Sequence, residues 1–445
     1  MQSDSSRHDP VDAQESPIER KHQPLRSAPG VAVALLLLHV IFEYLRLHQI
    51  WPELGELKVQ TVIFAALLLI VISETGKRGV RLARQSWLLL GFLGLTVFAI
   101  LPATNQYYAY RFVYSLTLIL IGYFAITHFL QNERDLKRFL SLLVGIHIYL
   151  GLKVILGYNP RGFNPQGYQT DFTAGSSFLG DENDVALAMI LILPLAFYLF
   201  GQARSLPKRV FWGVGSVLIL FTIIFTFSRG GFLGLGAMTL YWVITSKNKV
   251  KAISAFVLAG ALVMAVAPSE YWTRMETIKD TDQGTALERR NSWAGARRMF
   301  YDSPIWGVGG NNFAVLHSDY AIEYSEEKRP TRWGRVSHSM YFDLLAEFGL
   351  LGVLLIGSIL WLNFRDLRRI ISMSDSGYCS ASMGMLAMSL RLSWVGFLVP
   401  AAFLSVLSYP HLYYLTALTV VARDLASADE GAVTIEPVTA LEKVK

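Results

Sequence analysis

Twelve apolar runs follow one another from one end of the chain to the other. Crossing a hydrocarbon core of ~30 Å at ~1.5 Å per residue takes about 20 mostly apolar residues, so the shorter runs would recruit flanking residues. The runs are 31–47, 57–73, 87–101, 109–130, 139–156, 185–200, 210–227, 231–244, 252–267, 340–362, 392–407 and 409–421. The pattern predicts an all-α integral membrane protein, a polytopic bundle of about twelve transmembrane helices.

Composition agrees with this interpretation. Of the 445 residues, 53% are hydrophobic and 17% are charged, whereas a soluble protein of this length would carry more charge and shorter apolar runs. The single cysteine, Cys379, excludes an intramolecular disulfide and a multi-cysteine metal site. Residues 1–30 are polar and mixed in charge, and they lack the basic-then-apolar order of a signal peptide. We expect them to form a disordered cytoplasmic tail.

Basic residues gather in the even-numbered connections between the runs. Lys and Arg in short loops resist translocation, so this alternation places both termini in the cytoplasm and the odd-numbered connections outside. The longest connection lies between the ninth and tenth predicted helices, and long translocated segments are exempt from the charge rule. The expected organisation is a cytoplasmic tail 1–30, helices one to nine in 31–267, a large external catalytic loop 268–337, helices ten to twelve in 338–424, and a cytoplasmic tail 425–445.

Arg229 stands between two apolar runs with almost no loop, in Phe227-Ser228-Arg229-Gly230-Gly231. A charge near membrane depth is costly and usually faces a water-filled cavity or a partner. A guanidinium can hold phosphate oxygens in a bidentate way. The alternative is an arginine that snorkels to the outer surface, with the glycines serving helix packing.

The external loop contains an arginine-rich segment that starts at Leu287. Helical spacing would place Arg289 on one stripe with Trp293 and two further apolar residues, while Arg290 points to solvent or lipid headgroups. Pro304 ends this predicted helix, and the glycines from 307 to 310 permit a tight turn. We interpret the turn as one that folds the loop back onto the membrane, in preference to a loop that cradles phosphate.

His338 opens the tenth predicted helix, where the polar loop meets the apolar run. A neutral histidine, with a pKa near ~6.5, can take a proton from a sugar hydroxyl. Ser337 can cap the helix, and Tyr341 would share the His338 face. Glu347, nine residues on, would lie on the opposite face and pair within the bundle. The alternative for His338 is a side chain that only bridges headgroups and core.

The pattern Asp280-Thr281-Asp282 matches the short motif of metal-dependent sugar transferases. Three-residue patterns arise by chance, and this one lies in a loop that needs solvating charges. We therefore expect no essential metal and no cofactor.

Three motifs together resemble the O-antigen ligase and polymerase superfamily. They are Ser228-Arg229-Gly230-Gly231, the arginine and Trp293 helix leading to Pro304-Ile305-Trp306-Gly307-Val308-Gly309, and His338-Ser339 followed by Leu344 to Gly352. The long external loop also falls where the ligases have theirs. The segment Phe178 to Asp184 is similar to a subgroup associated with exopolysaccharide or protein O-glycosylation loci.

The resemblance implies a transferase of the bacterial inner membrane with its loop in the periplasm. The donor would be a glycan on undecaprenyl diphosphate, and the acceptor a hydroxyl of lipid A-core, a polysaccharide or a protein. Arg229 and either Arg289 or Arg290 would hold the diphosphate, and His338 would activate the acceptor. Secondary candidates are Arg161, Asp181, Asn183 and Tyr341.

The resemblance also bears on mechanism and on the competing functions. The diphosphate already activates the donor, so transfer would be metal-independent, would need no ATP, and would invert the anomeric carbon. No nucleic acid partner is expected. A polymerase of the same superfamily would use the same residue types. A flippase or transporter would instead show an internal repeat and ionisable residues at mid-membrane, whereas the charges here gather at the external face.

Overall fold

The computed structural model describes residues 28–47, 51–78, 82–156, 179, 181–279, 284–320 and 334–433. Every regular element in these ranges is helical and none is a strand, which confirms the all-α class. A helix covers at least part of each of the twelve predicted runs. These helices are α1 (Gly30–Leu45), α4 (Val59–Arg78), α5 (Arg84–Phe98), α6 (Gln106–Phe129), α7 (Glu133–Leu156), α8 (Glu182–Gln202), α9 (Leu206–Phe225), α10 (Arg229–Thr245), α11 (Lys249–Val266), α15 (Met340–Asp375), α16 (Ala381–Leu398) and α17 (Pro410–Val433).

Further helical elements complete the described part of the chain. They are α3 (Pro52–Glu56), α12 (Ser269–Glu276), the 3-10 turn η2 (Thr277–Lys279), α13 (Gly284–Asp302), α14 (Phe313–Tyr320) and the 3-10 turn η3 (Pro400–Phe403). The predicted helix in the external loop is confirmed as α13, and it ends at Asp302, just before Pro304. The loop is thus largely helical wherever it is described.

Six helices in the described ranges are long and apolar enough to cross a membrane: α6, α7, α8, α9, α15 and α16 with η3. The bent pair formed by α11 with α12 and η2, whose parts meet at 110°, would make a seventh. Helices α1 and α4 are apolar but shorter. The chain is therefore an α-helical membrane protein, while the twelve spans and their orientation stay predictions.

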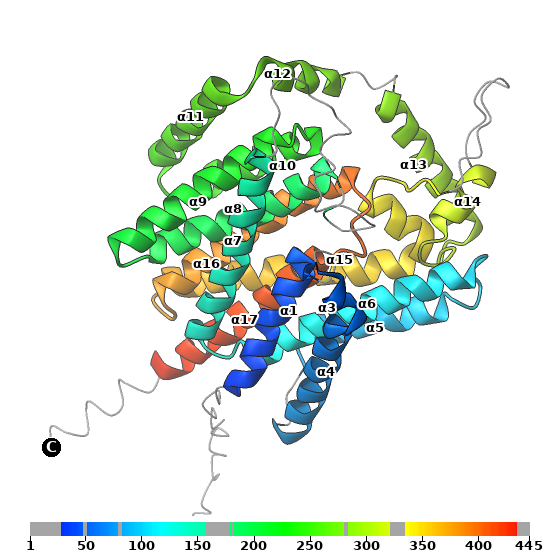
Figure 1. Ribbon diagram of the computed structural model, residues 1–445, viewed down its shortest axis with the longest axis horizontal. Helices are drawn as coiled ribbons and strands as arrows, with labels where there is room; N and C mark the ends of the chain where they lie inside the picture. Colours follow the sequence, from blue (N-terminus) through cyan, green and yellow to red (C-terminus); the bar gives the residue numbers. More distant parts are fainter. Residues whose placement is uncertain are drawn as a thin grey trace, which may run out of the picture.

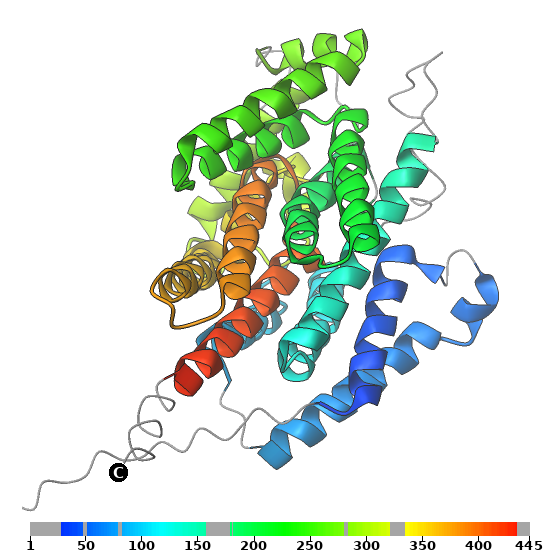
Figure 2. The same cartoon turned by 90° about the vertical axis from the view of Figure 1, so that its left-hand side faces the viewer.

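Helix α15 forms the centre of the bundle. It packs against α5, α16 and α17, and its first turns contact α13 (Figure 1). Helix α8 joins α16 to α9, and α10 covers both α8 and α16. Figure 2 shows α17, in red, to the left of the blue N-terminal helices and below the green helices of the middle of the chain. The packing brings the starts of α8, α10 and α15, which are far apart in sequence, to the same region.

Three predicted runs near the C-terminus have other boundaries in the structure. The run 392–407 is not one helix, because α16 begins at Ala381 and ends at Leu398. Ser380 caps α16 by accepting a hydrogen bond from the Met383 amide at 3.3 Å, and Pro400 ends the α-helical pattern. The charge of Arg391, just before the predicted run, interrupted the apolar pattern within α16. Likewise α15 extends to Asp375, beyond the predicted end at residue 362, and α17 continues to Val433.

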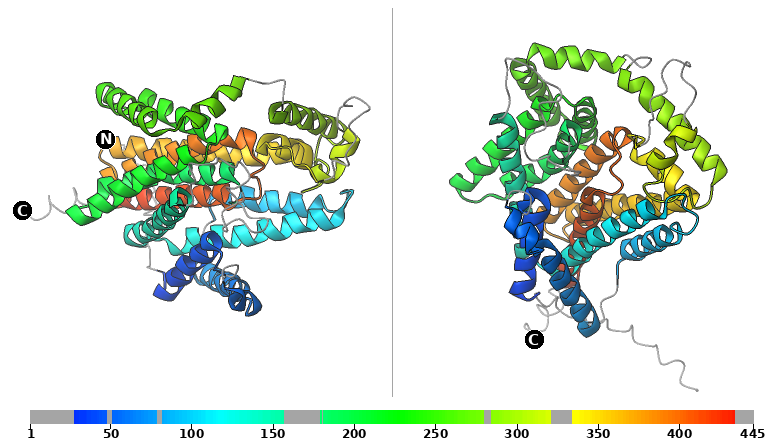
Figure 3. Two further views of the ribbon diagram at one scale, coloured as in Figure 1. Left: turned by 45° about the horizontal axis from the view of Figure 1, so that its top comes forward. Right: turned by 45° about the vertical axis from the view of Figure 1, so that its right-hand side comes forward.

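The turn that follows α13 packs against α15 at a break in that helix. Gly349 has φ 57° and ψ −156°, which interrupts the helix. The Leu350 amide donates to the Pro304 carbonyl at 2.8 Å, and the Leu351 amide donates to the Ile305 carbonyl at 3.1 Å. The 268–337 loop is in this way anchored in the side of α15. Figure 3 shows α13 and α14 at the same end of the bundle as the adjoining ends of α5 and α6.

Candidate functional site

The start of α10 is tied to the start of α8. The Ser228 hydroxyl caps α10 by accepting a hydrogen bond from the Gly231 amide at 3.0 Å, and it donates to Asn183 Oδ1 at 2.7 Å. Asp181 in turn caps α8, accepting from the amides of Asn183 and Asp184 at 2.8 and 2.9 Å. These contacts place Asp181 and Asn183, two of the secondary candidates, beside the residue that opens α10.

Arg229, the first residue of α10, reaches toward the external loop. Its Nη1 donates to Thr277 Oγ1 at 3.3 Å and lies 3.5 Å from the Thr277 carbonyl oxygen. Arg274, one turn earlier on α12, forms an ion pair with Glu182 at 2.9 Å. The α12–η2 segment is therefore held over the starts of α8 and α10, and the side chain of Arg229 is half-buried beneath it.

Arg289 approaches the same place from α13. Its pKa is lowered by burial and next by the positive charge of Arg229, while Asp181 acts in the opposite direction. Its Nε is buried without a hydrogen-bond partner within the described ranges. Arg290, the neighbouring residue, has an exposed side chain. The fold thus brings Arg289 rather than Arg290 toward Arg229, as expected from the helical stripe.

His338 completes this cluster. Partial burial and next the charge of Arg289 lower its pKa, whereas Asp181 raises it. A histidine with a lowered pKa is neutral at pH 7 and can accept a proton. We call Asp181, Arg229, Arg289 and His338 the arginine–histidine site. It has more positive than negative charge before any ligand binds, which suits an anion.

The backbone at His338 differs from the prediction. His338 has φ 52°, an uncommon conformation for a residue other than glycine, and it precedes the helix rather than opening it. The helix begins at Met340, with Ser339 at the N-cap and no side-chain cap. The predicted Ser337 cap was therefore wrong, because the Ser337 hydroxyl donates to the Ser339 carbonyl at 2.9 Å and accepts from its amide at 3.0 Å.

Trp293 holds the His338 segment in place. Its indole N–H donates to the Ser337 carbonyl at 3.1 Å, and its ring stacks on Phe342 with centroids 5.1 Å apart and planes 15° apart. Strained backbone of this kind persists where its surroundings fix it, and such positions cluster at functional sites. The α13 helix therefore supplies both Arg289 and the support for His338.

The other sequence candidates have different placements. The Tyr341 hydroxyl donates to the Leu398 carbonyl at 2.7 Å, so it joins the start of α15 to the end of α16. Arg161, and also Asp280 and Asp282, lie outside the described residues. Glu347 is buried within the protein, as predicted, where Oε1 accepts a hydrogen bond from the Phe313 amide at 3.1 Å.

The backbone amides of the glycine turn after α13 form hydrogen bonds within the protein. The Gly307 amide donates to the Ser303 carbonyl at 3.1 Å. The amides of Val308 and Gly309 donate to the carbonyls of Ala346 and Glu347 at 2.9 and 3.0 Å. This confirms a turn that folds the loop back, and these three N–H groups are not available to cradle phosphate.

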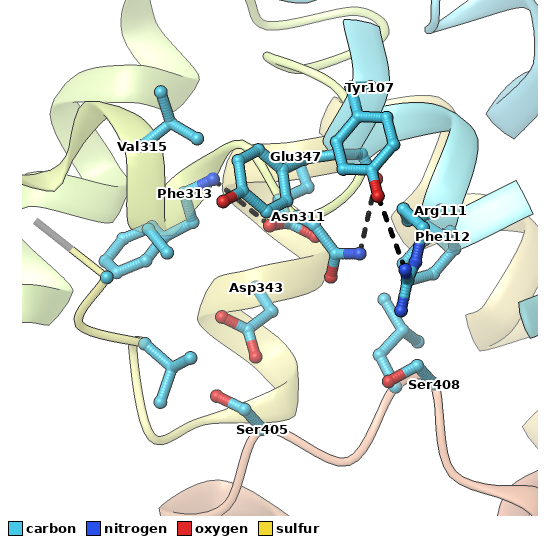
Figure 4. A pocket seen from close by; sticks show the side chains of 15 residues that line it. Tyr107, Arg111, Phe112, Asn311, Phe313, Val315, Asp343, Glu347, Ser405 and Ser408 are labelled. Atoms are coloured by element: carbon cyan, nitrogen blue, oxygen red, sulfur yellow. Dashed lines mark hydrogen bonds between the residues drawn. The ribbon is translucent and has the colours of Figure 1, made fainter. Parts of the chain in front are cut away.

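Sequence reasoning missed a cavity of about 590 Å³ next to the His338 segment (Figure 4). Its wall combines the start of α6, the 311–315 segment, residues 334 and 336, the first turns of α15, and the 405–408 linker. These segments are far apart in the chain, and only their packing brings them together. One local signal was present, since Asp343 is a carboxylate one turn inside a run otherwise counted as apolar.

The family model described as O-antigen ligase matches residues 214–357. That range contains Arg229, Arg289 and His338. It also contains α13 and the part of α15 that includes the break at Gly349. A search of the curated proteins found no match to the chain. The family match confirms the resemblance seen in the sequence and supports glycosyl transfer of the O-antigen ligase or polymerase type in general.

Proposed function

We propose that this protein, a member of the O-antigen ligase superfamily, transfers a glycan from undecaprenyl diphosphate to an acceptor hydroxyl at the periplasmic face of the bacterial inner membrane. One observation carries the proposal. Arg229 and Arg289 come from different helices, the charge of Arg229 lowers the pKa of Arg289, and the charge of Arg289 lowers the pKa of His338. Like charges held near one another, with Asp181 as a counter-charge, favour an anionic group between them.

The arginine pair would serve the leaving group. As the bond between the anomeric carbon and the diphosphate oxygen breaks, negative charge develops on that oxygen. Preorganised donors aimed at developing charge are usually the largest electrostatic contribution to catalysis. Arg289 is suited to this role because its buried Nε has no hydrogen-bond partner among the described residues.

His338 would serve the attacking oxygen. The acceptor hydroxyl gives its proton to the imidazole while its oxygen forms the new bond to the anomeric carbon, and the diphosphate leaves from the opposite face. Attack opposite the leaving group inverts the configuration at that carbon. The donor is already activated by its diphosphate, so the step uses neither ATP nor a metal ion.

The proposed arrangement in the membrane follows the charge alternation of the loops. It has twelve spans, both termini in the cytoplasm, and the 268–337 loop in the periplasm. The lipid part of the donor would stay in the bilayer while its diphosphate rises to the starts of α8 and α10. The acceptor would be lipid A-core, a polysaccharide or a protein.

Transfer by the purified protein in proteoliposomes tests the proposal. Undecaprenyl-diphosphate glycan is supplied with lipid A-core, a soluble oligosaccharide or a pilin-type protein, in buffer that contains a chelator. We expect a glycosylated acceptor in chelator and without ATP. A ladder of longer glycans still on undecaprenyl diphosphate would instead identify a polymerase. Movement of the donor across the bilayer without any new glycosidic bond would contradict the proposal and identify a transporter.

A further inference from the structure

The 590 Å³ cavity borders the segment that leads to His338. Val336 lines the cavity, whereas His338, two residues on, is influenced by Arg289 and Asp181. The cavity is therefore adjacent to the segment that carries the proposed base, and none of Asp181, Arg229 and Arg289 lines it.

Two buried carboxylates form the inner wall of the cavity. Asp343 is 7% exposed and Glu347 is 6% exposed, and they stand one turn apart on α15 (Figure 4). The Ser405 hydroxyl lies beside Asp343. A carboxyl group accepts hydrogen bonds whether or not it is protonated. This inner wall thus offers hydrogen-bond acceptors to hydroxyl donors.

Aromatic and amide groups form the outer part of the cavity. Tyr107 is exposed at the mouth, where its hydroxyl lies 3.4 Å from Nη1 of Arg111. The Asn311 amide donates to the Tyr108 carbonyl at 3.3 Å, which fixes the loop against α6. Ligand pockets of ~300–1,000 Å³ typically combine apolar and aromatic walls with a few placed polar groups. A pyranose ring, with hydroxyls on its edge and C–H groups on its faces, matches both kinds of wall.

We infer that this cavity binds an uncharged pyranose of the acceptor, with Asp343 and Glu347 receiving its hydroxyls and Tyr107 covering one face of the ring. The inference rests on the proposed function and extends it by naming the acceptor class. A sugar bound here lies beside the segment that carries His338, and a neighbouring part of the acceptor presents the reacting hydroxyl to the imidazole. A site built to hydrogen-bond hydroxyls discriminates strongly, because a ligand without them leaves buried polar groups unpaired.

Thiol labelling can test the inference without relying on transfer. Val336→Cys is introduced together with Cys379→Ser, and its rate of reaction with a small methanethiosulfonate is measured in proteoliposomes. The probes are methyl glucoside, methyl galactoside and methyl mannoside, compared at equal concentration with methyl glucuronide and with inorganic phosphate. We expect at least one neutral glycoside to slow labelling several-fold, and the two anions to have little effect.

Two further variants link the protection to the proposed walls. Asp343→Asn and Tyr107→Ala, each added to Val336→Cys, should abolish protection by the neutral glycoside. Tyr110→Ala should keep it, because Tyr110 is similarly exposed on the same helix but does not line the cavity.

Some outcomes would overturn the inference. These are no protection by any of the three neutral glycosides, equal protection by methyl glucuronide or phosphate, or full protection in Asp343→Asn. A protein that shows protection but transfers no glycan would contradict the proposed function and leave the sugar site standing. A protein that transfers glycan without protection would contradict the sugar site alone.

Discussion

Replacing Gly349 with alanine should disconnect the external loop from α15. The φ of 57° and ψ of −156° at Gly349 lie in a region that is essentially restricted to glycine. A Cβ there would stand 2.7 Å from the carbonyl carbon and oxygen of Ile305 and from the carbonyl oxygen of Pro304. These are backbone atoms, which cannot rotate away as a flexible side chain would.

The expected loss of stability takes one of two forms. Holding alanine in this conformation costs ~1–3 kcal/mol. If the backbone moves instead, the hydrogen bonds from Leu350 and Leu351 to the loop, at 2.8 and 3.1 Å, are lost at ~0.5–1.5 kcal/mol each. Either outcome gives a decrease of roughly 1–3 kcal/mol in the free energy of unfolding.

The assay uses the single cysteine. Cys379 is buried, so the temperature at which a fluorogenic maleimide reacts with it reports unfolding in detergent, and size-exclusion chromatography checks the same samples. Gly357→Ala is the matched control, because Gly357 is on the same helix with helical backbone and with nothing within 4 Å of its added Cβ. We expect Gly349→Ala to react at a clearly lower temperature and Gly357→Ala at the wild-type temperature or above. Equal temperatures for the two variants would refute the reasoning.

Two further predictions concern topology and the arginines. In a cysteine-free background, Ser318→Cys should react with a membrane-impermeant thiol reagent in intact cells and Ser205→Cys should not; labelling at 205 would reverse the proposed orientation. Arg229→Lys and Arg289→Gln should impair transfer without loss of protein, since lysine lacks the planar guanidinium, while Arg290→Gln, at an exposed position, should transfer almost normally. Full transfer by both Arg229→Lys and Arg289→Gln would remove the diphosphate assignment.

The sequence was sufficient for the helical class, for the α13 helix and for the residues that now meet at the arginine–histidine site. Helical periodicity placed Arg289 on a stripe with Trp293 and Arg290 elsewhere, because this requires only local geometry, but the resemblance left open which of the two belongs to the site. Hydropathy failed where polar residues lie inside a helix. Arg391 falls in the middle of α16, and the predicted run began only after it.

The break in α15 and the acidic cavity depend on packing between distant segments. A glycine within a helical run does not reveal by itself that its neighbours hydrogen-bond a loop some 45 residues earlier. Likewise Asp343 and Tyr107 are more than 200 residues apart, so no local pattern relates them. The cap assigned to Ser337 failed for a related reason, because the Trp293 contact and the positive φ of His338 delay the start of the helix to Met340.

The rate of transfer by His338→Ala tests the central claim most directly. A positioned general base contributes ~10²- to 10⁴-fold, so the variant should lose about that factor while its affinity for the donor stays unchanged. The pKa of His338 is lowered by partial burial and by Arg289. The wild-type rate should therefore hold at neutral pH and fall only below the ordinary imidazole range near ~6.5, as the ring becomes protonated, and this decline should be absent from the residual rate of His338→Ala. Transfer by His338→Ala at the wild-type rate, or a defect confined to donor binding, would contradict the account.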